Sequence, residues 1–448
     1  MADLPLSRRD FLTQSALGAS AATLVPREVL GGPEYTPPSD TLRVGGIGVG
    51  GKGAVDIRSV AALDGTEVVA LCDVDRQQAE DVYREYPDVP KYEDYRELLV
   101  QEENRLDAVV VSTPDHTHAP AALQALEAGL HVFCQKPLTH TVEEARRLGE
   151  AARGSGLATQ MGIQHHAHDG LRTVREIIEA GAIGPVREVH LWTDRPIWPQ
   201  AVERPLEMYH VPEHLNWDLW LGPAEERPYH PDYVPFNWRG WHAFGTGALG
   251  DMGCHFMDGA FWALQLEAPT RIVAETTPTY PESYPAASRL EYQFPARNGR
   301  PAVTMVWRDG HIEAPPPPSW PQDEEWPPPG YNEVFVGDDG ALLYGLSQTP
   351  RILPTSRHEE VTANLPDQTY ERSPGIYADW VQACRGEGTP NTHFPDYAAP
   401  LTETVLLGNV AVRSQRPVEW DAEAGEITNH PDLNDYLRRS SYRSGWSL

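Results

Sequence analysis

The sequence predicts an α/β protein of two domains: a doubly wound parallel sheet, followed by an α+β domain with a large, mostly antiparallel sheet. Short apolar runs rich in β-branched residues alternate with helical stretches from residue 42 to about residue 163. From residue 164 the chain is rich in Trp, Pro and His, and its strand-like segments alternate between apolar and polar residues. A length of 448 residues is enough for two or three domains.

The composition is that of an acidic globular protein. Lys and Arg total 36 against 65 Asp and Glu, which gives a net charge of -29. Because phosphate binding requires clustered basic side chains, this charge argues against nucleic acids and anionic membranes as partners. Only three residues are lysine: Lys52, Lys91 and Lys136. Excess acid with little lysine predicts a halophilic protein, and a GC-rich genome is the alternative explanation.

Residues 1–30 are predicted to be a twin-arginine export signal. Arg8 and Arg9 precede an uncharged stretch of small residues, with Ala19-Ser20-Ala21 as one candidate cleavage site. The apolar stretch is too short to span a bilayer, so we expect a periplasmic or other extracytoplasmic protein with no membrane contact after signal removal. Residues 31–41 are predicted to be a linker.

The first domain is predicted over residues 42–163. Its strand-like runs are 43–49, 67–73, 106–114, 131–137 and 157–164. Its helical stretches are 54–63, 76–86, 119–129 and 141–152. Thr141 and Glu144 have the spacing of a capping box that opens the last of these helices. Strands buried on both faces and joined by helices form a doubly wound sheet.

The second domain is predicted over residues 164–448. Its alternating strands are expected at 186–194, 271–278, 289–295 and 302–309. Residues 314–329 contain so many prolines that they can continue neither a sheet nor a helix, and we expect a surface loop there.

A glycine motif follows the first predicted strand. Gly48, Gly50 and Gly53 form G-x-G-x-x-G, the pattern that lets a backbone approach a pyrophosphate at a helix N-terminus. Asp73 ends the next strand, where a carboxylate accepts both ribose hydroxyls and repels a 2′-phosphate. The sequence therefore predicts a bound dinucleotide, NAD, with NADP as the alternative because Arg76 lies nearby.

Two further strands end in polar residues at the edge that faces the ligand in such a sheet. Ser112, Pro114 and His118 are predicted to lie beside the cofactor, although a plain strand-to-helix turn also explains the histidines of this stretch. Gln135 and Lys136 end the following strand. Gln135 is also predicted to contact the cofactor, and the Lys136 ammonium would stabilise a substrate alkoxide. A solvated surface lysine is the alternative.

An aspartate and a histidine lie four residues apart in a glycine-rich helical stretch. Asp251 and His255 would share one face of the helix, the arrangement in which a carboxylate orients an imidazole base. Loop position alone suggests the residues that contact the substrate: Gln164, His165, Asp194, Arg195 and Trp241. Metal binding by His165, His166 and His168 is a weaker alternative, and the four scattered cysteines suggest no zinc site.

In this order, the glycine motif, the acidic strand end, "STPDHTH", "QKP" and "GDMGCH" resemble the Gfo/Idh/MocA family of oxidoreductases. The resemblance covers residues 42–448 and implies a Rossmann domain, followed by an α/β domain whose open sheet forms a dimer or tetramer interface. It places Lys136, Asp251 and His255 in the substrate site. The family's usual Glu before Lys-Pro is Gln135 here, so Lys136 is expected to lack an adjacent anion.

The leading functional hypothesis is an NAD-dependent oxidoreductase that acts on a secondary hydroxyl of a sugar or cyclic polyol. An exported enzyme meets no pool of NAD, so its cofactor would be retained. A redox-neutral glycosidase or epimerase that passes through a keto-sugar is the second hypothesis. A nucleotide-binding sugar sensor without turnover is the third.

Overall fold

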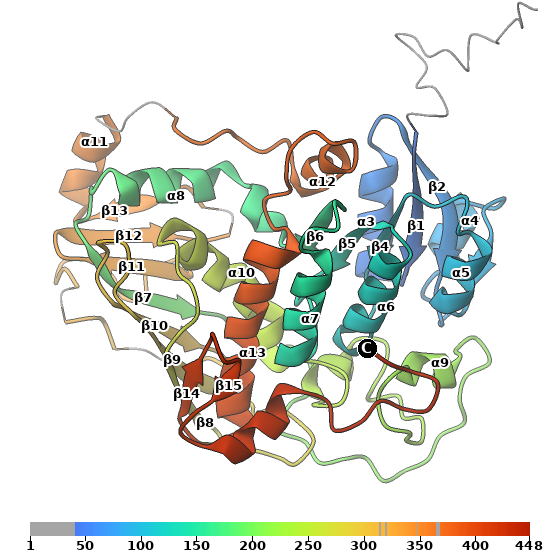
Figure 1. Cartoon of the computed structure of the whole chain (residues 1–448). Helices are drawn as coiled ribbons and strands as arrows, with labels where there is room; N and C mark the ends of the chain where they lie inside the picture. Colours follow the sequence, from blue (N-terminus) through green and yellow to red (C-terminus); the bar gives the residue numbers. More distant parts are fainter. Residues whose placement is uncertain (1–40, 313–314, 319, 347, 364–367) are drawn as a thin grey trace, which may run out of the picture.

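The computed structural model describes residues 41–448, except 313–314, 319, 347 and 364–367 (Figure 1). The predicted export signal, and the predicted linker up to residue 40, lie outside the described residues. Among the helices of the described part, none is long and apolar enough to cross a membrane.

The first sheet has six parallel strands in the order β3-β2-β1-β4-β5-β6. The strands are β1 (Leu42–Ile47), β2 (Thr66–Cys72), β3 (Lys91–Tyr92), β4 (Ala108–Val111), β5 (His131–Gln135) and β6 (Thr159–Gly162). The helices that connect them are α3 (Lys52–Ala61), α4 (Glu80–Glu85), α5 (Tyr95–Gln101), α6 (Asp115–Glu127) and α7 (Val142–Ala152). The predicted capping box at Thr141 and Glu144 opens α7. The doubly wound parallel sheet is confirmed.

The second sheet has nine strands in the order β13-β12-β11-β7-β10-β9-β8-β14-β15. Its strands are β7 (Val186–Trp192), β8 (Arg271–Thr276), β9 (Ser288–Phe294), β10 (Val303–Arg308), β11 (Glu333–Gly337), β12 (Gly340–Tyr344), β13 (Arg351–Leu353), β14 (Val418–Asp421) and β15 (Glu426–Ile427). All neighbouring strands are antiparallel except β7 and β10. The mostly antiparallel second sheet is therefore confirmed.

Helices cover one face of this sheet, because α8, α10 and α13 contact its strands. The α-helices after β6 are α8 (Asp169–Glu179), α9 (Trp217–Leu221), α10 (Gly247–Ala263), α11 (Thr355–Ala363), α12 (Ile376–Cys384) and α13 (Ala399–Ser414). Shorter turns are the 3-10 helices η2 (Gln164–Ala167), η3 (Asn237–Gly240) and η5 (Pro431–Leu437), and the π-helical η4 (Phe394–Ala398).

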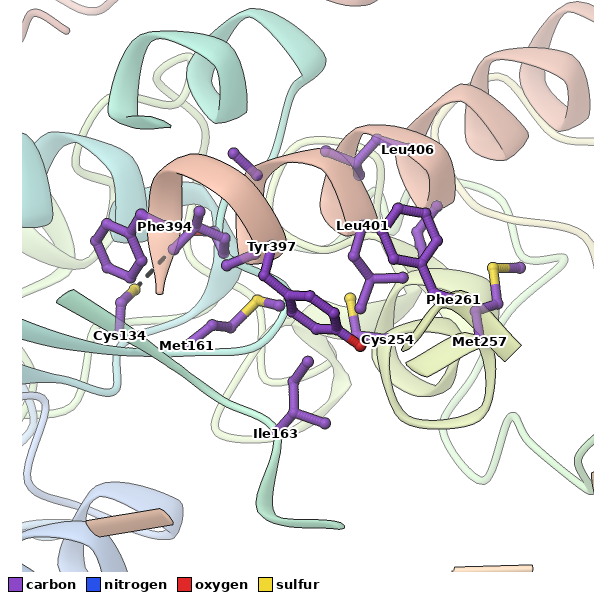
Figure 2. Close-up of a cluster of buried hydrophobic side chains, with 14 of the residues drawn as sticks. Cys134, Met161, Ile163, Cys254, Met257, Phe261, Phe394, Tyr397, Leu401 and Leu406 are labelled. Carbon is purple, nitrogen blue, oxygen red and sulfur yellow. Dashed lines mark hydrogen bonds between the residues drawn. The ribbon is translucent and has the colours of Figure 1, made fainter. Parts of the chain in front are cut away.

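The two domains share one hydrophobic core. Figure 2 shows side chains of β6, α10, η4 and α13 packed together, with Met161, Cys254 and Tyr397 among them. Helix α12 also returns to the first domain, where Trp380 packs against Phe133 of β5. The ends of the parallel strands are thus held against α10, which carries the predicted Asp-His pair.

Residues 320–329 of the proline-rich segment fold back onto the other face of the second sheet. Trp320 and Trp326 pack together with ring centroids 4.8 Å apart, and Trp326 also contacts Trp192 of β7 at 5.7 Å. These rings lie over a cluster of buried side chains on the outer face of β11, β12 and β13. Neither helix nor strand occurs among the described residues of this segment, as its prolines predict.

Candidate active site

The glycine motif forms the turn between β1 and α3. Gly48 has φ +75°, and a Cβ on it would lie 2.9 Å from the Ser112 carbonyl group. A Cβ on Gly53 would lie 1.8 Å from the Gly48 oxygen, so only glycine allows the helix to pack this close. No side chain caps the N-terminus of α3. Its free backbone N–H groups therefore suit a pyrophosphate.

Asp73 lies at the end of β2, beside this turn. Its Oδ2 accepts hydrogen bonds from the N–H groups of Val49 and Gly50, both at 2.9 Å, and its Oδ1 accepts one from Asp75 N–H at 2.9 Å. Burial raises the pKa of Asp73 to about 6. The carboxylate thus lies beside the phosphate-binding turn, where a ribose would be placed.

Arg76 is the residue because of which NADP remained an alternative cofactor. Its side chain contacts two glutamates of the protein. Its guanidinium donates to the Glu213 carbonyl oxygen at 2.6 Å and lies 3.9 Å from a carboxylate oxygen of Glu93. The residues present therefore fit a nucleotide with free ribose hydroxyls.

The buried carboxylate of Asp56, on α3, accepts hydrogen bonds from two of the predicted cofactor residues, Ser112 and Gln135. Ser112 Oγ donates to its Oδ2 at 2.8 Å, and Gln135 Nε2 donates to the same atom at 2.9 Å. Tyr377 of α12 donates to its Oδ1 at 2.6 Å, and Lys52 forms an ion pair with it. Asp56 thereby fixes the ends of β4 and β5 beneath the glycine turn.

The segment Pro114 to His118 is the start of α6. Pro114 is the residue before the helix. His118 is buried, and its Nδ1 and Nε2 lie 2.8 Å from the Pro137 and 2.7 Å from the Thr113 carbonyl oxygens. The predicted cofactor contact of His118 needs correction, because both ring nitrogens are used by the scaffold.

Lys136 extends from the end of β5 to α10. Its Nζ donates to Asp251 Oδ1 at 2.9 Å and to the Asp251 carbonyl oxygen at 2.8 Å. Arg239 of η3 donates to the same Oδ1 at 3.2 Å. Burial acts to raise the pKa of Asp251, but the charges of Lys136 and Arg239 outweigh it and lower the pKa to about 2. The expectation that Lys136 lacks an anion is wrong, because α10 supplies one.

His255 lies one helical turn after Asp251, as the spacing predicts, but the two side chains are not hydrogen-bonded to each other among the described residues. The imidazole is 9% exposed, and its buried Nδ1 has no partner. Burial and the charge of Lys136 lower the pKa of His255 well below its usual value. Asp251 therefore orients Lys136 and Arg239, and not His255.

The turn η2 places two predicted substrate residues beside this centre. The ring of His165 lies 5.3 Å from that of His255, centroid to centroid, and the buried Gln164 Nε2 has no partner. His166 faces the interior and hydrogen-bonds Asp258 at 2.8 Å. The three histidines of this stretch therefore do not converge on one point, and no group of metal ligands occurs among the described residues.

The other predicted substrate residues are Trp241, Asp194 and Arg195. Trp241 is 1% exposed, donates from Nε1 to the Asp232 carbonyl oxygen, and packs in a core with Tyr233. That prediction is corrected, because the ring is enclosed. Asp194 and Arg195 follow β7, and no hydrogen bond or ion pair joins them to Lys136 or α10 in the described structure.

Arg239 is the residue of this centre that the sequence did not predict. Its guanidinium lies 4.3 Å from the ring centroids of both Phe236 and Trp238, and it binds Asp251. The centre thus combines two cations held by one carboxylate with an imidazole whose enclosed Nδ1 has no hydrogen-bond partner in the described structure. Such an arrangement can stabilise an oxyanion and accept a proton.

Comparison with known proteins gives two family matches. Residues 42–163 match the oxidoreductase family, NAD-binding Rossmann fold, and residues 171–299 match the C-terminal alpha/beta domain of the same family. The two segments together make up more than half of the chain. The first domain is therefore an NAD-binding Rossmann domain, and the glycine turn and Asp73 lie within the matched segment.

Curated relatives match over about a third of the chain. A glycosyl hydrolase family 109 protein from Shewanella pealeana is 33% identical over 172 residues, which are 33% of this chain and 37% of that protein. An inositol 2-dehydrogenase from Burkholderia multivorans is 37% identical over 154 residues, 34% of this chain and 45% of that protein. The chain thus spans less than half of the length of these relatives.

Solved structures share the fold over most of the chain. Levoglucosan dehydrogenase, in complex with NADH and levoglucosan, has a TM-score of 0.58 and 18% identity, covering 85% of this chain and 99% of that one. The WlbA dehydrogenase from Chromobacterium violaceum, with NADH and UDP-GlcNAcA, has a TM-score of 0.59 and 15% identity, covering 86% and 97%. These likenesses show the shared fold, and the two family matches show that the chain belongs to the Gfo/Idh/MocA family of oxidoreductases.

Proposed function

We propose that the protein oxidises or reduces a secondary hydroxyl of a sugar or cyclic polyol with NAD. The observation that carries this proposal is the Lys136–Asp251 ion pair of 2.9 Å, one helical turn from His255, whose Nδ1 has no hydrogen-bond partner in the described structure. An ammonium and an imidazole side by side are the two groups that deprotonation of a carbinol requires. Relatives named as an inositol dehydrogenase and a levoglucosan dehydrogenase support the substrate class.

In the oxidative direction, His255 Nε2 takes the hydroxyl proton and Lys136 stabilises the developing alkoxide. Asp251 keeps the ammonium in place through two hydrogen bonds from Lys136 Nζ. The glycine turn and Asp73 would hold NAD, which supplies the acceptor for the two electrons that leave the carbinol carbon. We expect Gln164 and His165 to contact the remaining hydroxyls, since the ring of His165 lies beside that of His255.

The proposal is tested by assaying NAD reduction with myo-inositol, levoglucosan and related polyols. Lys136→Met should lower kcat by about 10²- to 10⁴-fold, because alkoxide stabilisation is lost, and should leave the Kd for NAD unchanged. Lys91→Met is the matched control, because Lys91 is exposed in the edge strand β3, away from this centre. Equal kcat in wild type and Lys136→Met would contradict the assignment.

We further propose that the chain is exported by the twin-arginine pathway, works as a homo-oligomer and retains its cofactor. The Arg8-Arg9 signal supports export, and an exported enzyme needs a nucleotide that stays bound. Under these conditions a redox-neutral reaction becomes the second candidate: the sugar is oxidised, cleaved or epimerised beside the ketone, and reduced again. The glycosyl hydrolase name of one relative favours this candidate. Release of the aglycone from a nitrophenyl glycoside, with no net NADH, would distinguish it.

A further inference from the structure

Three histidines form a row from His255 to the surface. The rings of His255 and His165 are 5.3 Å apart between centroids and nearly perpendicular, at 82°. The rings of His165 and His168 are 5.1 Å apart at 79°. They come from α10, from η2 and from the residue before α8. Neither the Asp-His spacing nor the proposed reaction explains this row.

Burial decreases along the row. His255 is buried, His165 is half-buried, and His168 is exposed. The Nδ1 atoms of His255 and His165 are both enclosed, and neither has a hydrogen-bond partner in the described structure. His168 Nδ1 lies 3.1 Å from the Leu346 carbonyl oxygen, which leaves its Nε2 free. A buried ring nitrogen without a partner is costly, so its retention calls for a reason.

The surroundings of His255 oppose a lasting positive charge. Lys136 and, farther away, Lys52 act on its ring, and Asp251, the nearest carboxylate, is already bound to Lys136 and Arg239. A proton taken up at Nε2 would leave an imidazolium whose Nδ1–H has no acceptor. The base can act again only when that proton leaves.

We propose that His165 and His168 carry the proton that His255 takes from the substrate hydroxyl out to the solvent. The inference rests on the proposed function. The N–H bond on His255 Nδ1 breaks as an N–H bond forms on His165 through one bridging water molecule, and His168 then protonates water. The proton enters each ring at one nitrogen and leaves from the other, so each imidazole ends as its opposite tautomer and must exchange tautomers before the next turnover. The substrate electrons are not involved.

The neighbours of the two outer histidines suit this path. The charge of the buried Asp258 also acts on His165 and favours its protonated form. Burial, followed by the influence of His168, lowers the pKa of His165 to about 4, so that it is neutral and able to accept a proton at neutral pH. Asp169, which follows His168, is exposed and can attract the proton outward.

The test follows proton release in the NAD-loaded protein by stopped flow with a pH indicator, while NADH absorbance reports oxidation of myo-inositol or levoglucosan. In wild type the two signals should rise together. In His165→Phe, release should lag NADH formation by at least about tenfold, and added imidazole should shorten the lag. His168→Gln should make the release rate depend on buffer concentration. His358→Gln, on α11, is the matched control and should behave as wild type.

If proton release and NADH formation remain simultaneous in His165→Phe, the proposed proton path through His165 is wrong. A raised KM that imidazole does not restore would also overturn it, because His165 would then only bind substrate. His165→Gln, which keeps a polar group, checks that a defect does not come from misfolding, and NAD binding should be unchanged in every variant. A wild type that reduces NAD with none of these alcohols would contradict the proposed function itself. This outcome is distinct from an active His165→Phe variant without a lag, which contradicts only the proton path.

Discussion

Asp73 links cofactor binding to pH. Its pKa is raised to about 6 by burial, so the carboxylate becomes fully ionised only above that pH. Ionised oxygens accept ribose hydroxyls best, and we therefore expect NAD to bind more tightly as the pH rises from about 5 to about 8. The Kd should fall by about tenfold per pH unit below pH 6 and level off above it, as measured by fluorescence titration.

Asp73→Asn is the control for this dependence. The amide keeps the size of the side chain but does not titrate, so NAD affinity should be weak and constant across the same range. A wild-type Kd that does not change between about pH 5 and 8 would contradict the role of Asp73.

At the scale of residues, the sequence predicted that Lys136, Asp251 and His255 lie near one another. It did not predict which of them are hydrogen-bonded. Helical spacing places Asp251 and His255 on one face, and strand ends place Lys136 at the same edge. Hydrogen bonding depends on three-dimensional distance, and Asp251 binds Lys136 and Arg239 instead of His255. Arg239 comes from an irregular turn without a periodic signal, so sequence reasoning missed it.

Helix α3 is joined to β5 by the hydrogen bond from Gln135 to Asp56, which explains the amide before Lys136. Gln135→Glu would place a second carboxylate 2.9 Å from a buried one, and a Cβ on Gly162 would lie only 2.6 Å from the Gln135 amide, so there is no room to relax. We expect a loss of about 3 kcal/mol in the free energy of unfolding, measured by urea denaturation.

The double variant Asp56→Asn with Gln135→Glu reverses donor and acceptor across this contact. It should recover at least half of the stability that Gln135→Glu loses, together with NAD affinity. If the losses of the two single variants simply add, the hydrogen bond does not explain the amide at this position.

At the scale of elements, the strands of the first domain could be predicted because both of their faces are buried and their apolar runs are continuous. The short edge strand β3 was missed, since its two exposed or half-buried residues give no pattern. The helix α5 was missed as well. Strands β11 to β13 were also missed. The proline-rich loop covers their outer face, so they lack the alternation of a half-exposed strand.

The net charge of -29 acts on the whole molecule. Like charges repel in the compact state, and salt screens them as the Debye length falls from about 10 Å at 0.1 M to about 3 Å at 1 M. We expect Tm to rise by about 5 °C or more over this range of NaCl, as measured by calorimetry. Sucrose at equal osmolarity is the control, and a Tm that does not change with NaCl would contradict the proposed adaptation to salt.

The central claim concerns the whole molecule: an NAD-dependent oxidoreductase that keeps its cofactor. The most direct measurement purifies the full chain without added nucleotide, denatures it and identifies the released compounds by mass spectrometry. The account predicts about one NAD or NADH per chain, held by the glycine turn and Asp73. NADP in its place would contradict the role of Asp73, and no nucleotide, with no binding on later titration, would contradict the oxidoreductase assignment.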